Sequence, residues 1–431
     1  MTTQGKTTVA VLLTVGFALT ACRVEGDGSE ASQDGGGVQT DVGVTSDPCP
    51  EAVNADNGCI YLGTISDLTE GPFAPLAVPI VAAQEAFWQR VNEQGGIGGY
   101  DIDVTTNVRD NKYNPEVHNQ AYQEIKGEVL ALAQTLGSPT TAAILDDMKA
   151  SDVVAAPAAW TSAYEFEDVI LESGTNYCFE AMNSVDWAVR EFDAQTVMAV
   201  HYPGDYGGDA AAGVDAAAQA LGVEYAGVET GQGTTNQGTA IQAILTQQPD
   251  VVFVTTGPGD AAAIIGQTAA GGFRGTFVGT SPTWNPALLE SPAAPALKAA
   301  YFQSGPWAPF GGDTPGHEAM REALGDVTPS DGHTAGWIWS YPMKAALEAA
   351  VDNGDLTRAG LLEAVKGLET VDYEGMLPEA AGNYAGEPGE AAFRQSVISK
   401  VDEAAPTGVS VVEDLFASEA AEAHEFSGPC F

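Results

Sequence analysis

Basic residues are scarce in this chain of 431 residues, in which 16 lysines and arginines stand against 59 aspartates and glutamates, a formal net charge of −43. A surface this acidic repels phosphate backbones and anionic lipid headgroups. We therefore expect neither nucleic acid nor electrostatic membrane adhesion. Solubility alone accounts for the acidity, and the net charge says little about the sign of a ligand, because salt screens surface charge within about 10 Å.

Metal-binding and catalytic patterns are also missing. The five histidines are scattered and no Cys-x-x-Cys pair occurs, so we expect no metal site. The chain has no Gly-x-Ser-x-Gly elbow, no Ser-x-x-Lys pair and no His-Glu-x-x-His motif. The turn that starts at Gly257 follows a strand and opens a helix, but it lacks the third glycine of a dinucleotide-binding turn. The sequence therefore predicts no enzyme and no cofactor.

Long apolar runs are absent beyond the N-terminus. Lys6 precedes the apolar run 9–19, which is shorter than the ~18 residues of a membrane-spanning helix, and small residues follow. This order is typical of a signal peptide. Its end, Leu19-Thr20-Ala21-Cys22, resembles the bacterial lipobox, which implies that Cys22 is acylated. Residues 1–22 thus predict a lipid-anchored protein on the extracytoplasmic face of the cell membrane; an ordinary secretory signal that happens to end in cysteine is the alternative.

The segment 23–48 differs from the rest in composition. It is rich in Gly, Ser, Asp, Glu, Gln and Thr, with three consecutive glycines at 35–37. Such a segment buries too little apolar area to offset the entropy lost on ordering. We expect a flexible linker that holds the folded body away from the membrane.

Cysteine is rare as well. With Cys22 assigned to lipid, four of the five cysteines remain: Cys49, Cys59, Cys178 and Cys430. An exported protein meets oxidising conditions, so these four are expected to form disulfides. Three pairings are possible. We favour Cys49 with Cys59, a short loop before the first strand, and Cys178 with Cys430, which would fasten the C-terminus.

Apolar strand candidates alternate with amphipathic helix candidates through much of the chain. The predicted strands are 60–65, 102–106, 129–134, 153–156, 196–200, 225–229, 251–255 and 276–279, and the predicted helices are 76–93, 115–125, 140–148, 207–221, 237–245 and 261–270. A long helix at 333–352 and strands at 396–401 and 408–412 complete the pattern. The alternation predicts an α/β protein, and its two series predict two lobes, each a mainly parallel sheet flanked by helices.

Six segments within 59–310 share the order and spacing of known motifs. They are 63–73, 92–99, 110–119, 136–141, 156–162 and 201–208. Together they resemble the type I solute-binding proteins of ABC importers, in particular the branched-chain amino-acid (Leu/Ile/Val) binding class. The resemblance implies a first lobe of 49–179 plus 306–374 and a second lobe of 180–305 plus 375–431. It also implies three crossing segments, near 177–180, 303–306 and 373–377.

The resemblance further implies a function. A protein of this class captures a small polar or carboxylate-bearing solute, such as an amino acid or an amide, between its lobes and delivers it to an ABC permease. A ligand-sensing lipoprotein of the same fold that reports to a receptor is the alternative. A secreted hydrolase would be a third reading, against which the missing nucleophile motifs argue.

Candidate ligand contacts follow partly from local chemistry. Ser138 precedes Pro139 as an N-cap precedes the first residue of a helix, and free N–H groups there suit a carboxylate, although simple capping explains Ser138 equally well. The resemblance adds Thr161, the Ala159 carbonyl and the aromatic Tyr206; Trp160 either lines the cleft or packs in a core. The full set of expected contacts is Ser138, Thr140, Ala159, Trp160, Thr161, Tyr206, Gly257 and Ser281.

One departure from the amino-acid binders concerns charge. Those proteins place an acidic residue after the strand that corresponds to 276–279, where it pairs with the ligand ammonium, whereas here Ser281 follows this strand. A buried ammonium without its counter-ion costs several kcal/mol. We therefore expect ligands without an α-ammonium to bind at least about tenfold better than leucine or valine.

Overall fold

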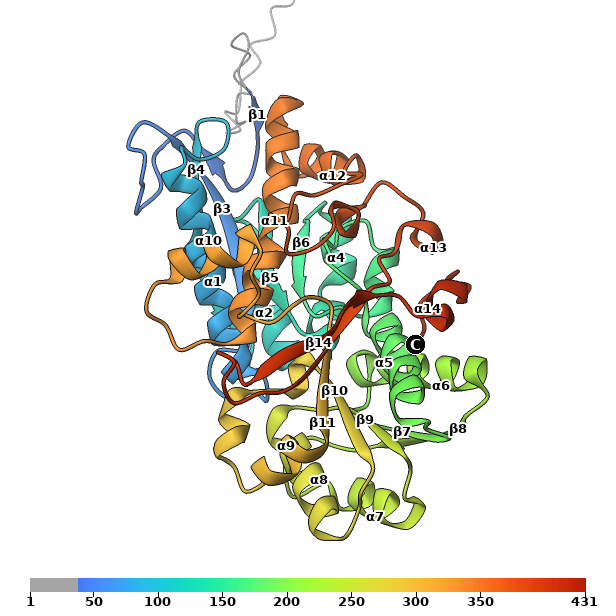
Figure 1. The fold of residues 1–431 in the computed structure, drawn as a ribbon. Helices are drawn as coiled ribbons and strands as arrows, with labels where there is room; N and C mark the ends of the chain where they lie inside the picture. The colour runs from blue at the N-terminus through green and yellow to red at the C-terminus, as the bar shows by residue number, and fades with distance from the viewer. Residues whose placement is uncertain (1–37) are drawn as a thin grey trace, which may run out of the picture. The chain divides into compact units, whose positions relative to one another are not determined.

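Two larger β-sheets organise the part of the chain that the structure describes, residues 38–431 (Figure 1). In this computed structural model one sheet has five strands and the other seven, and most neighbouring strands run parallel. Helices flank both sheets, and the chain passes from one sheet to the other three times. The predicted α/β fold is thus confirmed. The limits predicted for the two lobes stay a prediction.

The first sheet centres on β3, which lies between β4 and β5. Eight of the nine residues of β3 are buried, as expected for a strand covered on both faces. Its strands are β2 (Val44–Thr45), β3 (Gly58–Ser66), β4 (Tyr100–Asp110), β5 (Ala131–Leu136) and β6 (Ala155–Ala158). The helices between them are α1 (Ala74–Glu93), α2 (Pro115–Ile125), α3 (Ser138–Ala142), α4 (Leu145–Ala150) and the 3-10 helix η1 (Ser162–Phe166).

The second sheet has the strand order β14-β13-β11-β10-β9-β7-β8, in which β13 and β14 run antiparallel to their neighbours. Its strands are β7 (Thr196–His201), β8 (Glu224–Glu229), β9 (Val251–Thr255), β10 (Thr276–Thr280), β11 (Tyr301–Gly305), β13 (Ser396–Val401) and β14 (Val409–Phe416). Its helices are α5 (Tyr177–Phe192), α6 (Asp205–Leu221), α7 (Gly238–Gln247), α8 (Pro258–Ala270), η2 (Ser281–Thr283), η3 (Pro286–Glu290) and α9 (Ala294–Ala300).

After β11 the chain returns to the first sheet. There α11 packs along α1, and the ring of Phe87 lies edge-on to Trp337 and Tyr341 at centroid distances of 5.1 and 4.9 Å. The remaining elements are β1 (Gln39–Thr40), α10 (Pro315–Leu324), α11 (Asp331–Asp352), β12 (Asp355–Leu356), α12 (Arg358–Lys366), η4 (Glu379–Gly382), α13 (Pro388–Ala391) and α14 (Glu419–Ala423). None of the helices in residues 38–431 is both long and apolar enough to cross a membrane.

Some predicted elements are wrong in detail. The single helix predicted at 140–148 is two short helices, α3 and α4, with a break at Ala143–Ile144. The linker predicted to reach residue 48 is wrong from Val38 onward, because β1 pairs with β12 and β2 pairs with β3. These two-residue strands have no periodicity of their own and form only against a partner. The predicted signal peptide, Cys22 and the rest of the linker lie outside the described residues.

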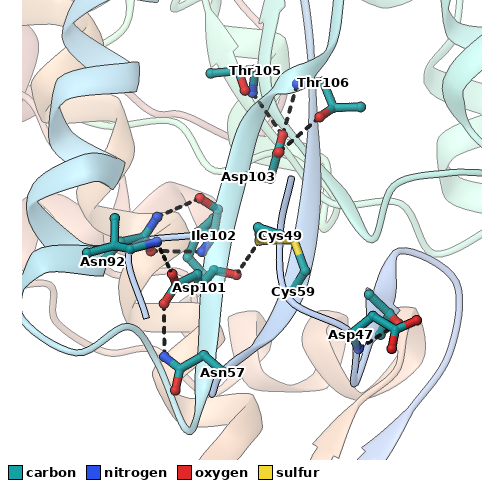
Figure 2. Close-up of a disulfide and its surroundings, with 12 residues drawn as sticks. Asp47, Cys49, Asn57, Cys59, Asn92, Asp101, Ile102, Asp103, Thr105 and Thr106 are labelled. Carbon is teal, nitrogen blue, oxygen red and sulfur yellow. Dashed lines mark hydrogen bonds between the residues drawn. A yellow bond between two sulfur atoms is a disulfide. The ribbon is translucent and has the colours of Figure 1, made fainter. Parts of the chain in front are cut away.

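The predicted Cys49–Cys59 disulfide is present at the entrance to β3 (Figure 2). Asp101 in the neighbouring strand β4 holds the loop between the two cysteines. Its carboxylate accepts hydrogen bonds from the backbone N–H groups of Val53 and Asn54, at 2.8 and 2.9 Å, and from the side chain of Asn57 at 2.9 Å. Burial alone would raise the pKa of Asp101, but these hydrogen bonds outweigh it and lower the pKa. The loop is therefore fixed by a charged acceptor as well as by the disulfide.

The predicted Cys178–Cys430 disulfide is also present. It joins the first turn of α5 to the C-terminal end of the chain. The backbone N–H of Cys430 donates to the Ser162 hydroxyl at 2.8 Å, and the ring of Phe426 lies 5.0 Å from the rings of both Phe166 and Phe179. The C-terminal segment is thus fastened to the chain between β6 and β7.

We predict that the two disulfides contribute unequally to stability. The Cys178→Ser, Cys430→Ser variant should lose roughly 2–5 kcal/mol of unfolding free energy, and the Cys49→Ser, Cys59→Ser variant should lose less. The reason is that the Cys178–Cys430 disulfide closes a loop with a sequence separation of 252, whereas the Cys49–Cys59 disulfide closes one with a separation of 10. Urea unfolding of both variants measures the difference. A larger loss from the shorter loop would contradict this ranking.

Candidate functional site

A cavity of about 70 Å³ lies where segments that follow strands of both sheets meet. From the first sheet come Ser138, after β5, and Ala159 and Trp160, after β6. From the second come Tyr206 at the start of α6 and Ser281 after β10. Parallel strands place these loops at the carboxyl ends of the sheets, where α/β proteins commonly bind ligands. The cavity is therefore the candidate binding site.

Three of the eight residues expected to contact a ligand lie outside the lining. The Thr140 hydroxyl donates to the backbone oxygens of Leu136 and Gly137, so it is occupied within its own turn. Thr161 is buried just before η1. Gly257 precedes α8, where an added Cβ would lie 3.1 Å from the Tyr202 hydroxyl. These residues shape the loops around the cavity, and all eight stay predictions as ligand contacts.

Ser138 does not cap its helix as expected. The N-cap of α3 is Gly137, at φ 95°, and Ser138 is the first helical residue. An added Cβ on Gly137 would lie 2.6 Å from the Thr140 hydroxyl and 2.7 Å from the Tyr113 ring, so only glycine fits this turn. The Ser138 hydroxyl is left buried at the cavity without a hydrogen-bond partner among the described residues. A buried polar atom of this kind is suited to bind a ligand.

Trp160 both lines the cavity and packs in the core. Its indole N–H donates to the Glu180 carboxylate at 2.7 Å, and the Ser304 hydroxyl donates to the other carboxylate oxygen at 2.5 Å. Glu180 is fully buried, and burial raises its pKa to about 7. Because Glu180 belongs to α5 and Ser304 to β11, this carboxyl joins two of the segments that cross between the sheets.

The second-sheet side of the cavity is held by hydroxyl groups. The Tyr206 hydroxyl lies 2.9 Å from the Thr280 hydroxyl, and burial raises the pKa of Tyr206. The Ser281 hydroxyl donates to the Ser304 carbonyl at 3.1 Å and accepts from the Gln303 amide at 3.3 Å. Tyr206 and Ser281 are thus positioned before any ligand arrives.

Asp331, the first residue of α11, is a cavity residue that the sequence analysis missed. One carboxylate oxygen accepts the Phe310 N–H at 3.1 Å. The other oxygen is buried without a hydrogen-bond partner of normal geometry, and the nearby side chains of Thr407 and Gln303 act to lower the pKa of this carboxyl. Burial outweighs these polar neighbours and raises the pKa of Asp331. The preference for ligands without an α-ammonium, which was expected from Ser281, did not take this acid into account and stays a prediction.

The sequence did carry a signal for Asp331. Ser330 and Asp331 open the long tryptophan-bearing helix as an N-cap and a first-turn acid do. The resemblance, however, indicates an acid after the strand 276–279 and not at the start of this helix. Asp331 follows the segment in which the chain crosses from β11 back to the first sheet. Only the tertiary structure shows that this position lies at the cavity.

The family model described as periplasmic binding protein matches residues 60–404. The chain belongs to this family. A fatty acid ABC transporter substrate-binding protein from Thermomonospora curvata is 30% identical, with a TM-score of 0.82 over 91% of this chain and 98% of that chain. The search of curated protein sequences finds no match.

More distant structures share the fold of this periplasmic binding protein. An ABC transporter substrate-binding protein from Aeropyrum pernix is 17% identical, with a TM-score of 0.73 over 84% of this chain and 98% of that chain. A branched chain amino acid ABC transporter from Thermus thermophilus with bound valine is 16% identical, with a TM-score of 0.70 over 85% and 98%. The type I periplasmic binding protein fold is thereby confirmed, as is a solute-binding rather than an enzymatic role on the extracytoplasmic side.

We predict that Glu180 makes stability depend on pH. Its pKa is raised from 4.5 to about 7 in the folded protein. The stabilisation of the folded state by the protonated carboxyl is therefore fully present below pH 4.5 and is lost as the pH rises through about 7. The Glu180→Gln variant keeps an acceptor for Trp160 but does not titrate. Its unfolding free energy relative to the wild type should therefore rise by roughly 1–3 kcal/mol over this interval.

Urea unfolding at a series of pH values measures this difference, with the exposed Glu363→Gln as the matched control. Parallel curves for the wild type and Glu180→Gln would show that the Glu180 carboxyl does not titrate in this range.

Proposed function

We propose that this periplasmic binding protein captures a small organic solute in the cavity between its two sheets and delivers it to an ABC importer. The observation that carries the proposal is that Ser138 and Ala159, on the side of the first sheet, share one cavity with Tyr206 and Ser281, on the side of the second. A solute there contacts both sides, so it favours the arrangement in which they close around it. The ABC transporter relatives support delivery to an importer.

The lining supports a solute with an apolar body and a compact polar head. Aliphatic and aromatic side chains, among them Leu76, Ile80 and Trp307, make up most of the wall. Polar atoms are few and separate, and the unpartnered ones belong to Ser138, Asp331 and the indole N–H of Trp339. Such a pocket gains affinity from apolar burial and orientation from its few polar groups. Fatty acids and valine, which the names of two relatives mention, both have this character.

We predict that blocking the cavity abolishes solute binding. A thermal-shift screen of amino acids, amides, short carboxylates and amines should find a solute that stabilises the wild type, by about 2.7 kcal/mol at 100 times its dissociation constant. The same solute should not stabilise Ser281→Phe, whose ring would occupy the cavity. Ala220→Phe, on the exposed face of α6, is the matched control and should respond like the wild type.

Circular dichroism of both variants shows whether they fold. Equal stabilisation of Ser281→Phe and the wild type would place the binding site elsewhere. Delivery is measured separately, by uptake of the labelled solute in cells that lack this protein; undiminished uptake would contradict the importer role.

We also propose that Cys22, outside the described residues, carries the lipid that attaches the protein to the membrane. The support is the lipobox-like segment that ends in Cys22 behind a charged start and a short apolar core. Cys22→Ala should appear in the soluble fraction or remain unprocessed, because it lacks the acylated thiol. Fractionation and electrophoretic mobility measure this outcome, and a variant that behaves like the wild type in both would rule out the anchor.

A further inference from the structure

A second pocket, of about 310 Å³, adjoins the cavity of the candidate site. Its lining residues are Tyr113, Pro139, Tyr202, Pro203, Tyr206 and Gln232. Tyr113 and Tyr206 also line the first cavity, so the two spaces meet at these two side chains. Because Pro203 and Gln232 are exposed, we call the second space the outer pocket.

The outer pocket is built from segments of both sheets, as the cavity is. Tyr113 follows β4 and Pro139 belongs to α3, whereas Tyr202 and Pro203 follow β7 and Gln232 follows β8. A molecule in the outer pocket therefore contacts both sides. Like a solute in the cavity, it favours the arrangement in which the two sides close.

The two shared tyrosines are held in place by the protein. The backbone of Tyr113 has a φ of 53°, in the left-handed region that bulky residues rarely adopt. Its N–H donates to the Asn111 side-chain oxygen at 2.7 Å, and the Asn111 amide donates to the Leu136 carbonyl at 3.1 Å. The Phe73 ring lies edge-on to Tyr113 and Tyr206, at centroid distances of 4.8 and 5.9 Å. Backbone conformations of this kind are frequent where a protein clamps a ligand.

The volumes of the two spaces differ in a way that bears on the length of the solute. A water-sized group needs roughly 10–15 Å³, so the cavity of about 70 Å³ holds on the order of five such groups. The outer pocket is several times larger. A solute that exceeds a few heavy atoms therefore extends past the tyrosines.

The wall of the outer pocket indicates what it accepts. Five of its six lining residues are Tyr or Pro, and no acidic or basic residue occurs among the described residues that line it. Rings of this kind pack well against apolar groups, and the wall offers no counter-ion to a charged one. The outer pocket is therefore suited to an uncharged hydrocarbon chain or ring.

We propose that the outer pocket is a second subsite for the same solute, which is an elongated molecule. Its compact end lies in the cavity, and its uncharged apolar tail passes between Tyr113 and Tyr206 into the outer pocket. This inference rests on the proposed function and names the class of solute. A solute without such a tail leaves the larger of the two spaces to water.

The first test varies the length of the tail. The probes are butanamide, hexanamide and octanamide, with the corresponding carboxylates and amines as two further series. Calorimetry should find at least one series in which the longest member binds at least about fivefold more tightly than the middle one. The reason is that each methylene that leaves water strengthens binding by up to about fourfold.

The second test fills the outer pocket and leaves the cavity open. Gln232→Trp should lower the affinity for the longest probe at least about tenfold, while the affinity for the shortest probe stays within about twofold of the wild type. Gln247→Trp, at the exposed end of α7, is the matched control and should bind both probes like the wild type. Circular dichroism shows whether both variants fold.

Three outcomes would overturn the inference. They are an affinity that stops rising at the middle member of every series, binding of the longest probe that Gln232→Trp leaves unchanged, and equal weakening of short and long probes by this variant. The last outcome would make the outer pocket only the entrance to the cavity. If no probe binds but the broad screen finds another solute, the inference falls and the proposed function stands. Failure of every solute in that screen would instead overturn the proposed function.

Discussion

The close approach of α11 to α1 is the constraint on which the cavity depends. A Cβ on Gly336 would lie 2.2 Å from the Ile80 carbonyl oxygen, and one on Gly332 would lie 2.5 Å from the Leu76 carbonyl oxygen. Any side chain at these two positions would push the helices apart. Both helices contribute to the cavity wall, α1 through Leu76 and Ile80 and α11 through its first turns. The spacing of two glycines thus sets the width of the site.

Two buried carboxyls near the cavity show how the same chemical group serves different ends. Both oxygens of Glu180 accept short hydrogen bonds, from Trp160 and Ser304, so this group fixes the scaffold. Asp331 has one oxygen engaged by a backbone N–H and the other free. Satisfied polar groups hold a structure in place, whereas an unsatisfied one at a cavity provides a contact for a ligand. The two buried carboxyls thus differ in how fully the protein itself satisfies them.

Local patterns in the sequence were enough to predict much of the fold. The bounds predicted for the helix 115–125 and the strands 251–255 and 396–401 are those observed, because periodicity and turn residues act over a few neighbours. The helix α5 was missed. Eleven of its 16 residues are buried, and they include the polar Glu180, Asn183 and Ser184, so its polar side chains do not mark a solvent-exposed face.

The candidate site was predictable only in part, because some of its residues are placed by contacts between distant segments of the chain. Loops after parallel strands meet at one edge, which brings Ser138, Trp160 and Tyr206 together once the strands are known. Asp331 and Trp307 reach the cavity from segments whose position depends on how the chain crosses between the sheets. No local pattern encodes that position.

The acidity of the whole protein and that of the cavity act over different distances. Exposed charges on a chain with a net charge of −43 are screened within about 10 Å, so they bring cationic solutes closer without choosing among them. Inside the cavity a carboxylate and aromatic rings act at contact distance with little water between them, where electrostatic interactions are stronger. Under the proposed function, selection among solutes is therefore a property of the cavity wall. The surface charge affects how often a solute arrives, and the cavity determines which one stays.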